Sequence, residues 1–269
     1  AKIFEAKRRP SDNPLIAHVG NLKQISELAE EVPPFAKLLI EKFFPGPLTL
    51  VLRRSEGVPL LATAGLETVG VRMPASSLAN EFLRACGTPV VAPSANLSGR
   101  PSPTTWEAVF EDLDGRIDCI LQGAPTDIGL ESTVVDCSDE VPLILRSGAV
   151  SLESLRGIVP SIRVYQASDS SPAKSPGMLH KHYAPSARVV IVAGYVDSEV
   201  PSAFIGLHSP KSEHRMVKIC SSVEDYARSV FAFFRECDHA NIQTIYCESV
   251  DEKGIGAALM DRLRRAEAR

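Results

Sequence analysis

The chain has 269 residues and a formal net charge of −4, and 44% of its residues are hydrophobic and 23% charged. This length allows one large domain or two ordinary ones, and the composition is that of a soluble globular protein. The negative net charge argues against a broad basic surface for nucleic acid, but it leaves room for a local anion site.

The sequence also argues against membrane insertion and secretion. No apolar run reaches the roughly 18 residues that a spanning helix needs, and the first residues, AKIFEAKRRP, lack the apolar core of a signal peptide. The six cysteines are scattered and form no CxxC pair. We therefore expect reduced thiols in a cytoplasmic protein that has no membrane contact.

Short apolar strands alternate with helical patterns up to about residue 150. A helix is expected at the start, ended by Pro10, and a strand at LIAHV. Further strands are expected at 48–54, 68–74, 88–96, 119–123, 132–138 and 142–148. Apolar residues at helical spacing predict helices at 25–44, 76–87 and 104–113. This mixture predicts an α/β domain built around a twisted sheet.

The composition changes after residue 163. Residues 164–187 are rich in Ser, Pro, Ala and Asp, which is typical of a connection between domains. Strands are then expected at 188–194, 203–209 and 244–249, and helices at 222–237 and 254–269. We expect a first domain at 1–163, a linker at 164–187, and a small Rossmann-like parallel-sheet domain at 188–269.

The linker contains SPGMLHKHYAP, residues 175–185. His180 and His182 would fall on one side of an extended chain and could share a metal ion. Zinc, however, takes about four ligands, and no Cys or carboxylate lies nearby at ligand spacing. A metal site, a catalytic segment and a linker all remain open, and composition favours a linker or a covering loop.

Cations end the first helix. Lys7 and Arg9 are explained either as solvated charges that complement the helix dipole or as phosphate ligands. Charge alone favours the first interpretation, and the second draws on the residues that come next in the chain, a turn at Asn13 and then His18 inside an apolar strand. A lone His in a strand is more often a satisfied core residue. A polar loop followed by a His inside a strand is nevertheless common along the lining of a cleft.

Two further arginines, Arg72 and Arg146, lie on otherwise apolar strands. A cation there is costly unless it meets an anion, which is either an internal carboxylate or an anionic ligand. Ser132 begins a nearby strand, but the absence of GxSxG and of an identifiable base argues against a hydrolase triad.

Polar residues follow the strand at 88–96. Ser94 and Asn96 open a loop rich in Ser, Gly and Pro before the helix at 104–113. Ligands of α/β proteins bind at the carboxyl ends of strands, although an ordinary turn with a helix cap explains the same residues. The chain has no GxxxxGK[ST] and no complete GxGxxG, so nucleotide would not be bound by a P-loop.

Taken together and in this order, the motifs resemble the threonylcarbamoyl-AMP synthase family, the YrdC-domain proteins, in their long two-domain form. The motifs that carry the resemblance are KRRPSDNPLIAHV, FPGPLTLVL, VGVRMP, PVVAPSANLSGRPSPT, ESTVVD, LRSG and SPGMLHKHYAP. The resemblance covers nearly the whole chain. It implies a twisted open sheet around a large positively charged cavity, followed by a linker and a small Rossmann-like domain.

The resemblance implies a synthase. L-threonine and bicarbonate or CO2 give an N-carboxylated threonine, whose carboxylate attacks the α-phosphorus of ATP and releases pyrophosphate. Separate partner proteins then transfer the threonylcarbamoyl group to the adenosine beside the anticodon of certain tRNAs. Mg²⁺ is expected with ATP, held largely by phosphates and water, and a weak affinity for RNA is a further expectation. The alternative is a YrdC-type module that binds RNA or nucleotide without synthase activity.

The resemblance also implies roles for individual residues. Lys7 and Arg9 match the pair that meets the phosphates and are the expected catalytic residues. The threonine-binding positions are His18, Arg72, Ala92 and Ser132. The remaining ATP-binding positions are Asn13, Thr68, Ser94, Asn96, Ser102, Arg146, Ser175, His182 and Tyr183. The segment 175–185 is then a linker that also serves as a lid over the cavity, which makes a metal site there less attractive.

One departure from the family pattern concerns the start of the chain. Family members begin with a strand and a Thr-Glu-Thr-x-Tyr-Gly type segment that helps to line the threonine site, and the sequence opens after that point, at Ala1. A polypeptide that truly began there would be expected to show weak or no synthase activity.

Overall fold

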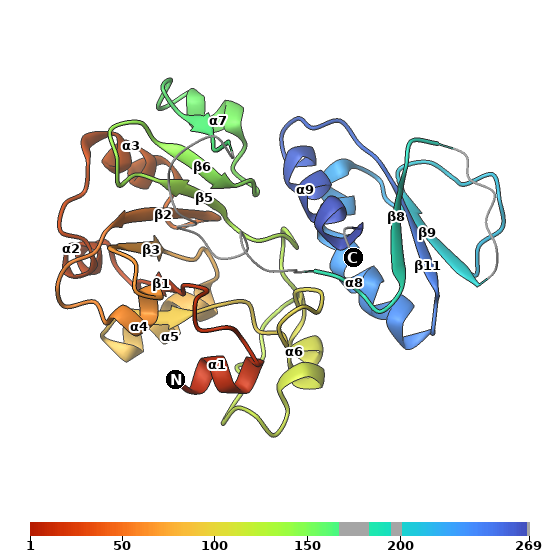
Figure 1. The fold of residues 1–269 in the computed structure, drawn as a ribbon, viewed down its shortest axis with the longest axis horizontal. Coiled ribbons are helices and arrows are strands. Elements are labelled where there is room, and N and C mark those ends of the chain that lie inside the picture. Colours follow the sequence, from red (N-terminus) through yellow and green to blue (C-terminus); the bar gives the residue numbers. More distant parts are fainter. Residues whose placement is uncertain (167–182, 195–200, 268–269) are drawn as a thin grey trace. The chain divides into compact units, whose positions relative to one another are not determined.

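The structure is a computed structural model that describes residues 1–166, 183–194 and 201–267 (Figure 1). The described chain forms two compact units. Unit 1 contains residues 1–5, 9–93 and 131–166, and unit 2 contains residues 6–8, 94–130, 183–194 and 201–267. Most of the expected linker at 164–187 therefore lies outside the described residues, and the expected domain boundaries at 163 and 188 stay predictions.

Unit 1 is built on a seven-stranded mixed sheet in the order β4-β1-β3-β2-β5-β6-β7. Its strands are β1 Ile16–His18, β2 Leu48–Arg53, β3 Thr68–Arg72, β4 Val90–Ala92, β5 Thr133–Asp136, β6 Leu143–Arg146 and β7 Arg163–Val164. The predicted α/β class and the predicted strands at 48–54, 68–74, 132–138 and 142–148 are confirmed. The two-residue strand β7 was not predicted, because a pair of residues carries no detectable alternation.

The pairing directions decide which strand ends meet. β1 and β3 are parallel, β2 is antiparallel to β3, and β4 is antiparallel to β1. β5 is parallel to β2, and β6 is antiparallel to β5. The carboxyl ends of β1, β3 and β6 therefore lie at the same edge of the sheet as the amino ends of β2, β4 and β5.

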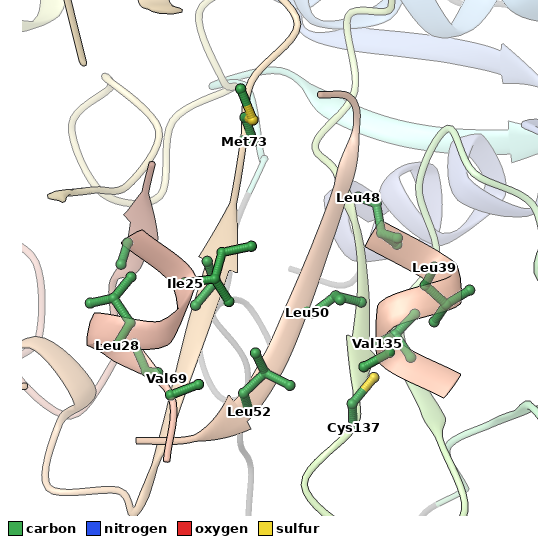
Figure 2. Close-up of a cluster of buried hydrophobic side chains, with 14 of the residues drawn as sticks. Ile25, Leu28, Leu39, Leu48, Leu50, Leu52, Val69, Met73, Val135 and Cys137 are labelled. Atoms are coloured by element: carbon green, nitrogen blue, oxygen red, sulfur yellow. The ribbon is translucent and has the colours of Figure 1, made fainter. Parts of the chain in front are cut away.

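The core of unit 1 lies around β2, where five successive residues of LTLVLR are buried. A run that is buried on both faces is typical of a central strand rather than of one with a solvated face. Leu50 and Leu52 pack in one cluster with Leu39 from helix α3 and Val135 from β5 (Figure 2).

The predicted helix at 25–44 is wrong as a single element. The structure has a short α2, Ile25–Leu28, and a separate α3, Pro34–Phe43. Pro33 and Pro34 explain the break. A proline has no N–H to donate and restricts the residue before it, so it suits the first turn of a new helix.

Further short helices belong to the parts of the chain between these strands and before them. They are α1 Lys2–Lys7, the 3-10 helix Leu22–Gln24, α4 Leu60–Thr63, α5 Ser77–Cys86, α6 Trp106–Leu113 and α7 Leu152–Arg156. The predicted helices at 76–87 and 104–113 are confirmed. Each has a hydroxyl N-cap, Ser76 accepting from the amide of Ala79 and Thr105 from that of Ala108.

The predicted strand at 119–123 is also wrong, since these residues form neither helix nor strand. Leu121 is 54% exposed and Cys119 is exposed as well. An apolar run becomes a strand only where another strand can pair with its backbone, and this one has no neighbour of that kind among the described residues. The predicted strand at 88–96 is present only as the three residues of β4.

Unit 2 contains a four-stranded parallel sheet in the order β10-β9-β11-β8. The strands are β8 Arg188–Val192, β9 Ser202–Gly206, β10 Met216–Ile219 and β11 Thr244–Glu248. Helices α8 Val223–His239 and α9 Gly256–Glu267 pack on this sheet and against each other (Figure 1). The predicted parallel-sheet second domain is confirmed, while the edge strand β10 was missed because most of it is exposed and it carries a lysine.

No helix in the described part of the chain is long and apolar enough to cross a membrane. All six cysteines are free; Cys137, Cys220, Cys237 and Cys247 are buried, whereas Cys86 and Cys119 are exposed.

Neighbouring leucines on α3 test the position of the core. Leu39 is fully buried and Leu38 is 49% exposed. Leu39→Ala should lower the free energy of unfolding by about 2–5 kcal/mol, because it leaves a cavity in the cluster. Leu38→Ala should change it by no more than about 0.5 kcal/mol. Urea unfolding followed by circular dichroism would measure both, and equal shifts of the midpoint would contradict this placement.

Candidate functional site

Four of the expected ligand residues come together at one edge of the unit 1 sheet. His18, Arg72 and Arg146 are the last residues of β1, β3 and β6, and Ser132 lies directly before β5. The strand directions bring these ends to the same edge, and His18 pairs with Arg72 across neighbouring strands. Residues that are 14 to 128 positions apart in the sequence thus share one place.

Arg72 is a half-buried cation with little to neutralise it. Its Nε donates to the carbonyl of Gly46 at 3.1 Å, and among the described residues no carboxylate forms an ion pair with it. Burial lowers the pKa of Arg72 to about 10, and the nearby charge of Arg146 contributes to the same decrease. Arg72 stays protonated at neutral pH, so an anion placed here would relieve both the desolvation and the repulsion.

Arg146 is held toward the same edge by Ser132. Its Nε donates to the carbonyl of Ser132 and its Nη2 to the Ser132 hydroxyl, both at 3.1 Å. The buried hydroxyls of Ser132 and Thr49 lie 2.8 Å apart and share a hydrogen bond. This chain of contacts fixes the Ser132 side chain and aligns the guanidinium of Arg146.

His18 is neutral at physiological pH. Burial, and then the charge of Arg72, lower its pKa to about 4. Its Nδ1 lies 3.1 Å from the carbonyl of Ile16, which can only accept, so Nδ1 carries the proton in that hydrogen bond. His18 therefore adds a polar, uncharged group beside the two arginines.

Three other expected site residues lie toward the opposite edge. Asn13 precedes β1, Thr68 begins β3, and Ala92 ends β4 opposite Ile16. Thr68 is four residues from Arg72 along β3, which corresponds to about 13 Å. The structure therefore does not bring these three together with the arginine edge.

Asn13 and Thr68 nevertheless share a property of ligand-binding groups. The Nδ2 atom of Asn13 and the Oγ1 atom of Thr68 are buried and have no hydrogen-bond partner among the described residues. Buried polar atoms are nearly always paired with protein or with something else, so each is a candidate for a ligand contact.

The expected catalytic cations both bond to backbone. In unit 1, Arg9 donates to the carbonyls of Asn13 and Pro14, at 3.4 and 3.0 Å, and so closes the turn before β1. In unit 2, the ammonium of Lys7 donates to the carbonyls of Ser94 and Asn96, the former at 2.5 Å.

Lys7 thus lies at the centre of the polar loop predicted at 94–102. The Ser94 hydroxyl donates to Oδ1 of Asn96 at 2.6 Å, and Nδ2 of Asn96 donates to the carbonyls of Leu97 and Arg100, both at 2.9 Å. The buried Asn96 side chain therefore closes the loop on itself, with Lys7 bound inside it.

Of the remaining expected site residues, the structure describes only Ser102 and Tyr183. Ser102 is buried at the end of this loop. Tyr183 is buried against the ring of Phe231, with 5.4 Å between centroids, and the guanidinium of Arg262 lies 5.4 Å from its ring. Ser175 and His182 lie outside the described residues, as does His180 of the metal hypothesis.

The sequence did not single out three participants. The Gly46 carbonyl contacts Arg72, and the Thr49 hydroxyl contacts Ser132. The fully buried carboxylate of Asp112 bonds to residues of the 94–102 loop. Thr49 alone left a signal, as a hydroxyl inside the apolar strand LTLVL. Among the described residues, no three His, Cys, Asp or Glu side chains are grouped so that they could hold a metal ion.

Family models match both halves of the chain. The model described as "Telomere recombination" matches residues 1–148, and the model described as "Threonylcarbamoyl-AMP synthase, C-terminal domain" matches residues 150–268.

Three curated relatives that match nearly the whole chain are named threonylcarbamoyl-AMP synthase. The threonylcarbamoyl-AMP synthase of Pyrococcus abyssi is 43% identical over 98% of this chain and 83% of its own length. That of Bacillus subtilis is 39% identical over 98% of this chain and 82% of its own. That of Schizosaccharomyces pombe is 33% identical over 98% and 78%, respectively.

Solved structures agree with the whole described fold. P. abyssi Sua5 complexed with L-threonine matches with a TM-score of 0.90 and 41% identity, over 99% of this chain and 83% of that one. P. abyssi Sua5 with a His and the following Tyr both replaced by Ala matches with a TM-score of 0.89 and 40% identity, over 99% and 82%. With this similarity extending over both halves of the sequence, the chain belongs to the threonylcarbamoyl-AMP synthase family.

Proposed function

We propose that the arginine edge of unit 1 binds L-threonine through its carboxylate, and that the enzyme converts this threonine, bicarbonate or CO2 and ATP into threonylcarbamoyl-AMP and pyrophosphate. The observation that carries this proposal is Arg72, a half-buried cation repelled by Arg146 and without an ion-pair partner among the described residues. The P. abyssi relative has been solved in complex with L-threonine, which supports the same ligand here.

The neighbouring groups suit the rest of that ligand. A planar guanidinium and a carboxylate can form two parallel charge-assisted hydrogen bonds. The Ser132 hydroxyl and the neutral His18 ring offer polar contacts to an amine or a hydroxyl without adding charge. An N-carboxylated threonine is a dianion, and the second cation, Arg146, would balance its carbamate group.

Catalysis is proposed to rest on positioning and charge neutralisation. The carbamate oxygen attacks the α-phosphorus of ATP, the bond to pyrophosphate breaks, and no covalent enzyme intermediate is needed. Lys7 and Arg9 would exchange their present carbonyl contacts for phosphate oxygens. Asn13 and Thr68, whose buried side-chain atoms have no partner within the described part of the chain, are proposed as nucleotide contacts, together with Ser94, Asn96 and Ser102 of the loop.

Mg²⁺ is proposed to arrive with ATP. The described residues offer no group of three acidic, His or Cys ligands for it, so phosphate oxygens and water would supply most of its coordination, as is usual for this ion. Its contribution when bound would be to neutralise phosphate charge.

Ser175, His182 and Tyr183 stay proposed nucleotide contacts, with residues 175–185 as the lid. The proposed downstream partners are the proteins that transfer the threonylcarbamoyl group to tRNA. The free cysteines are compatible with the reducing cytoplasm, which is the proposed location.

Pyrophosphate release tests the reaction itself. The full-length protein should release pyrophosphate only when L-threonine, bicarbonate and ATP are all present. Omission of any one substrate should abolish the signal. Release that does not depend on threonine would contradict the proposal.

Replacement of Arg72 tests the threonine contact. Arg72→Gln should weaken L-threonine binding by about 10- to 100-fold, the value of one charge-assisted pair. Arg53→Gln is the matched control, because Arg53 is the exposed last residue of β2, at the opposite edge, and its Nε donates to the carbonyl of Ser138. Isothermal titration with L-threonine would measure both, and equal affinities in the two variants would overturn the assignment.

The neutrality of His18 predicts a specific acid sensitivity. The pKa of His18 falls from 6.5 to about 4 on folding. Between these values the unfolded chain binds a proton that the folded protein does not, so stability declines as the pH falls from about 6.5 and levels off below about 4. At pH 5 the loss relative to pH 7 should reach up to about 2 kcal/mol.

His18→Asn removes this titration. Urea unfolding at pH 7 and pH 5 should therefore show a smaller loss of stability in the variant than in the wild type. The same loss in both proteins would show that His18 is not held neutral by the fold.

A further inference from the structure

A buried ion pair connects helix α8 with the segment that carries the polar loop. Arg235 on α8 donates from Nη1 and Nη2 to the two carboxylate oxygens of Asp112, at 3.2 and 2.8 Å. The side chain of Asp112 is fully buried and that of Arg235 is 5% exposed. The two residues are 123 positions apart, and each comes from a region matched by a different family model.

Both members of this pair also bond to the loop. Asp112 accepts from the amide of Leu97 at 3.2 Å and from Nη1 of Arg100 at 2.5 Å. Arg235 donates from Nη2 to the carbonyl of Pro101 at 2.6 Å. The loop is therefore bound at three points, directly after Asn96 and directly before Ser102.

Two residues that bond to Asp112, Leu97 and Arg100, also bond to the side chain of Asn96. The carbonyls of Leu97 and Arg100 are the two that accept from the Asn96 side chain. Asn96 in turn bonds to Ser94 and Lys7. A continuous set of hydrogen bonds thus runs from α8 through Asp112 and the loop to these three proposed nucleotide contacts.

A second ion-pair layer supports the first from its exposed side. Glu111 accepts from Arg100 at 2.8 Å and lies 3.2 Å from Nε2 of His239, at the end of α8. Burial opposes the ionisation of Glu111, but its hydrogen bonds with His239 and Arg100 outweigh that effect and lower the pKa. Glu111 is therefore charged at neutral pH and adds a second contact between α8 and the loop through Arg100.

A buried pair of this kind is not explained by stability alone. Well-packed apolar residues often stabilise a protein as much as a buried ion pair does, whereas a charge pair fixes one conformation of its neighbours. Three backbone and side-chain groups of the loop, from Leu97, Arg100 and Pro101, bond to this pair. Its most direct effect is therefore on the geometry of the loop.

We propose that Arg235 and Asp112 are positioning residues for ATP, through which the C-terminal domain holds the loop 94–102 in its nucleotide-binding form. This inference rests on the proposed role of Ser94, Asn96 and Ser102 in binding ATP. It assigns the C-terminal domain a part in the binding of ATP. The proposed threonine-binding residues belong to unit 1 and this network to unit 2, so ATP affinity should change while threonine affinity does not.

The test replaces both members of the pair together, because removal of Asp112 alone would leave the buried Arg235 with only the more distant Glu111, and removal of Arg235 alone would leave the fully buried carboxylate of Asp112 to Arg100 and the Leu97 amide. Arg235→Met combined with Asp112→Leu keeps the volume and should leave the fold intact, as judged by circular dichroism and thermal unfolding. The KM for ATP should rise at least tenfold, and kcat should change by less than threefold. The Kd for L-threonine, measured without ATP, should stay within twofold of the wild type.

Two further variants complete the design. Arg235→Lys keeps the buried charge but loses the two-pronged geometry, and it should give an intermediate ATP affinity, which is a partial rescue. Arg228→Met is the matched control: Arg228 is an exposed arginine on the same helix, paired with Asp225 one turn away, and its replacement should change neither affinity.

Calorimetry with a non-hydrolysable ATP analogue separates this inference from the proposed reaction. Tenfold weaker binding of the analogue by the double variant supports the inference, whether or not the wild type releases pyrophosphate. A wild type that releases no pyrophosphate would contradict only the proposed reaction. Unchanged analogue binding would overturn the inference, and so would parallel losses of ATP and threonine affinity, which indicate general damage to the fold.

Discussion

The burial of a charged arginine, Arg72, at one edge of the unit 1 sheet is the constraint on which the proposed site depends. Arg72 and Arg146 are carried there by the ends of β3 and β6, and burial and mutual repulsion lower the pKa of Arg72 to about 10 without removing its charge. Holding these cations beside a buried core of leucine and valine around β2 is unfavourable. In the proposed site an anionic ligand would offset that cost, and the neutral His18 and the hydroxyl of Ser132 would add polar contacts without further charge.

The structure assigns different tasks to the expected catalytic cations. Lys7 and Arg9 are two residues apart in the sequence, yet Lys7 binds the carbonyls of the 94–102 loop and Arg9 closes the turn at Asn13 and Pro14. Each is therefore bound to the backbone next to proposed nucleotide contacts. In the proposed reaction, phosphate oxygens would replace these carbonyls as the partners of each cation.

Local patterns in the sequence predicted much of the fold. Alternation and β-branched residues predicted the strands that carry Arg72, Ser132 and Arg146, whereas the anion expected beside the two arginines stays a prediction. The errors lie where tertiary context decides. Pro33 and Pro34 divide a helical pattern, and residues 119–123 have no strand to pair with in the described chain. β10 is an edge strand whose exposed side chains show no apolar pattern.

The site was predictable only in part for the same reason. Motif resemblance named the candidate residues, but not which of them share a place: the directions of the strands put Arg146 at the same edge as Arg72 and Thr68 at the other edge. The pairing of Asp112 with Arg235 joins residues 123 positions apart, and no local pattern predicts it.

The most direct measurement compares L-threonine with L-threoninamide, which lacks the carboxylate charge, by isothermal titration into the wild type and Arg72→Gln. If Arg72 binds the threonine carboxylate, the wild type should prefer L-threonine at least tenfold, the order of one charge-assisted contact, and the variant should bind both compounds about equally. The same preference in both proteins would contradict this role of Arg72.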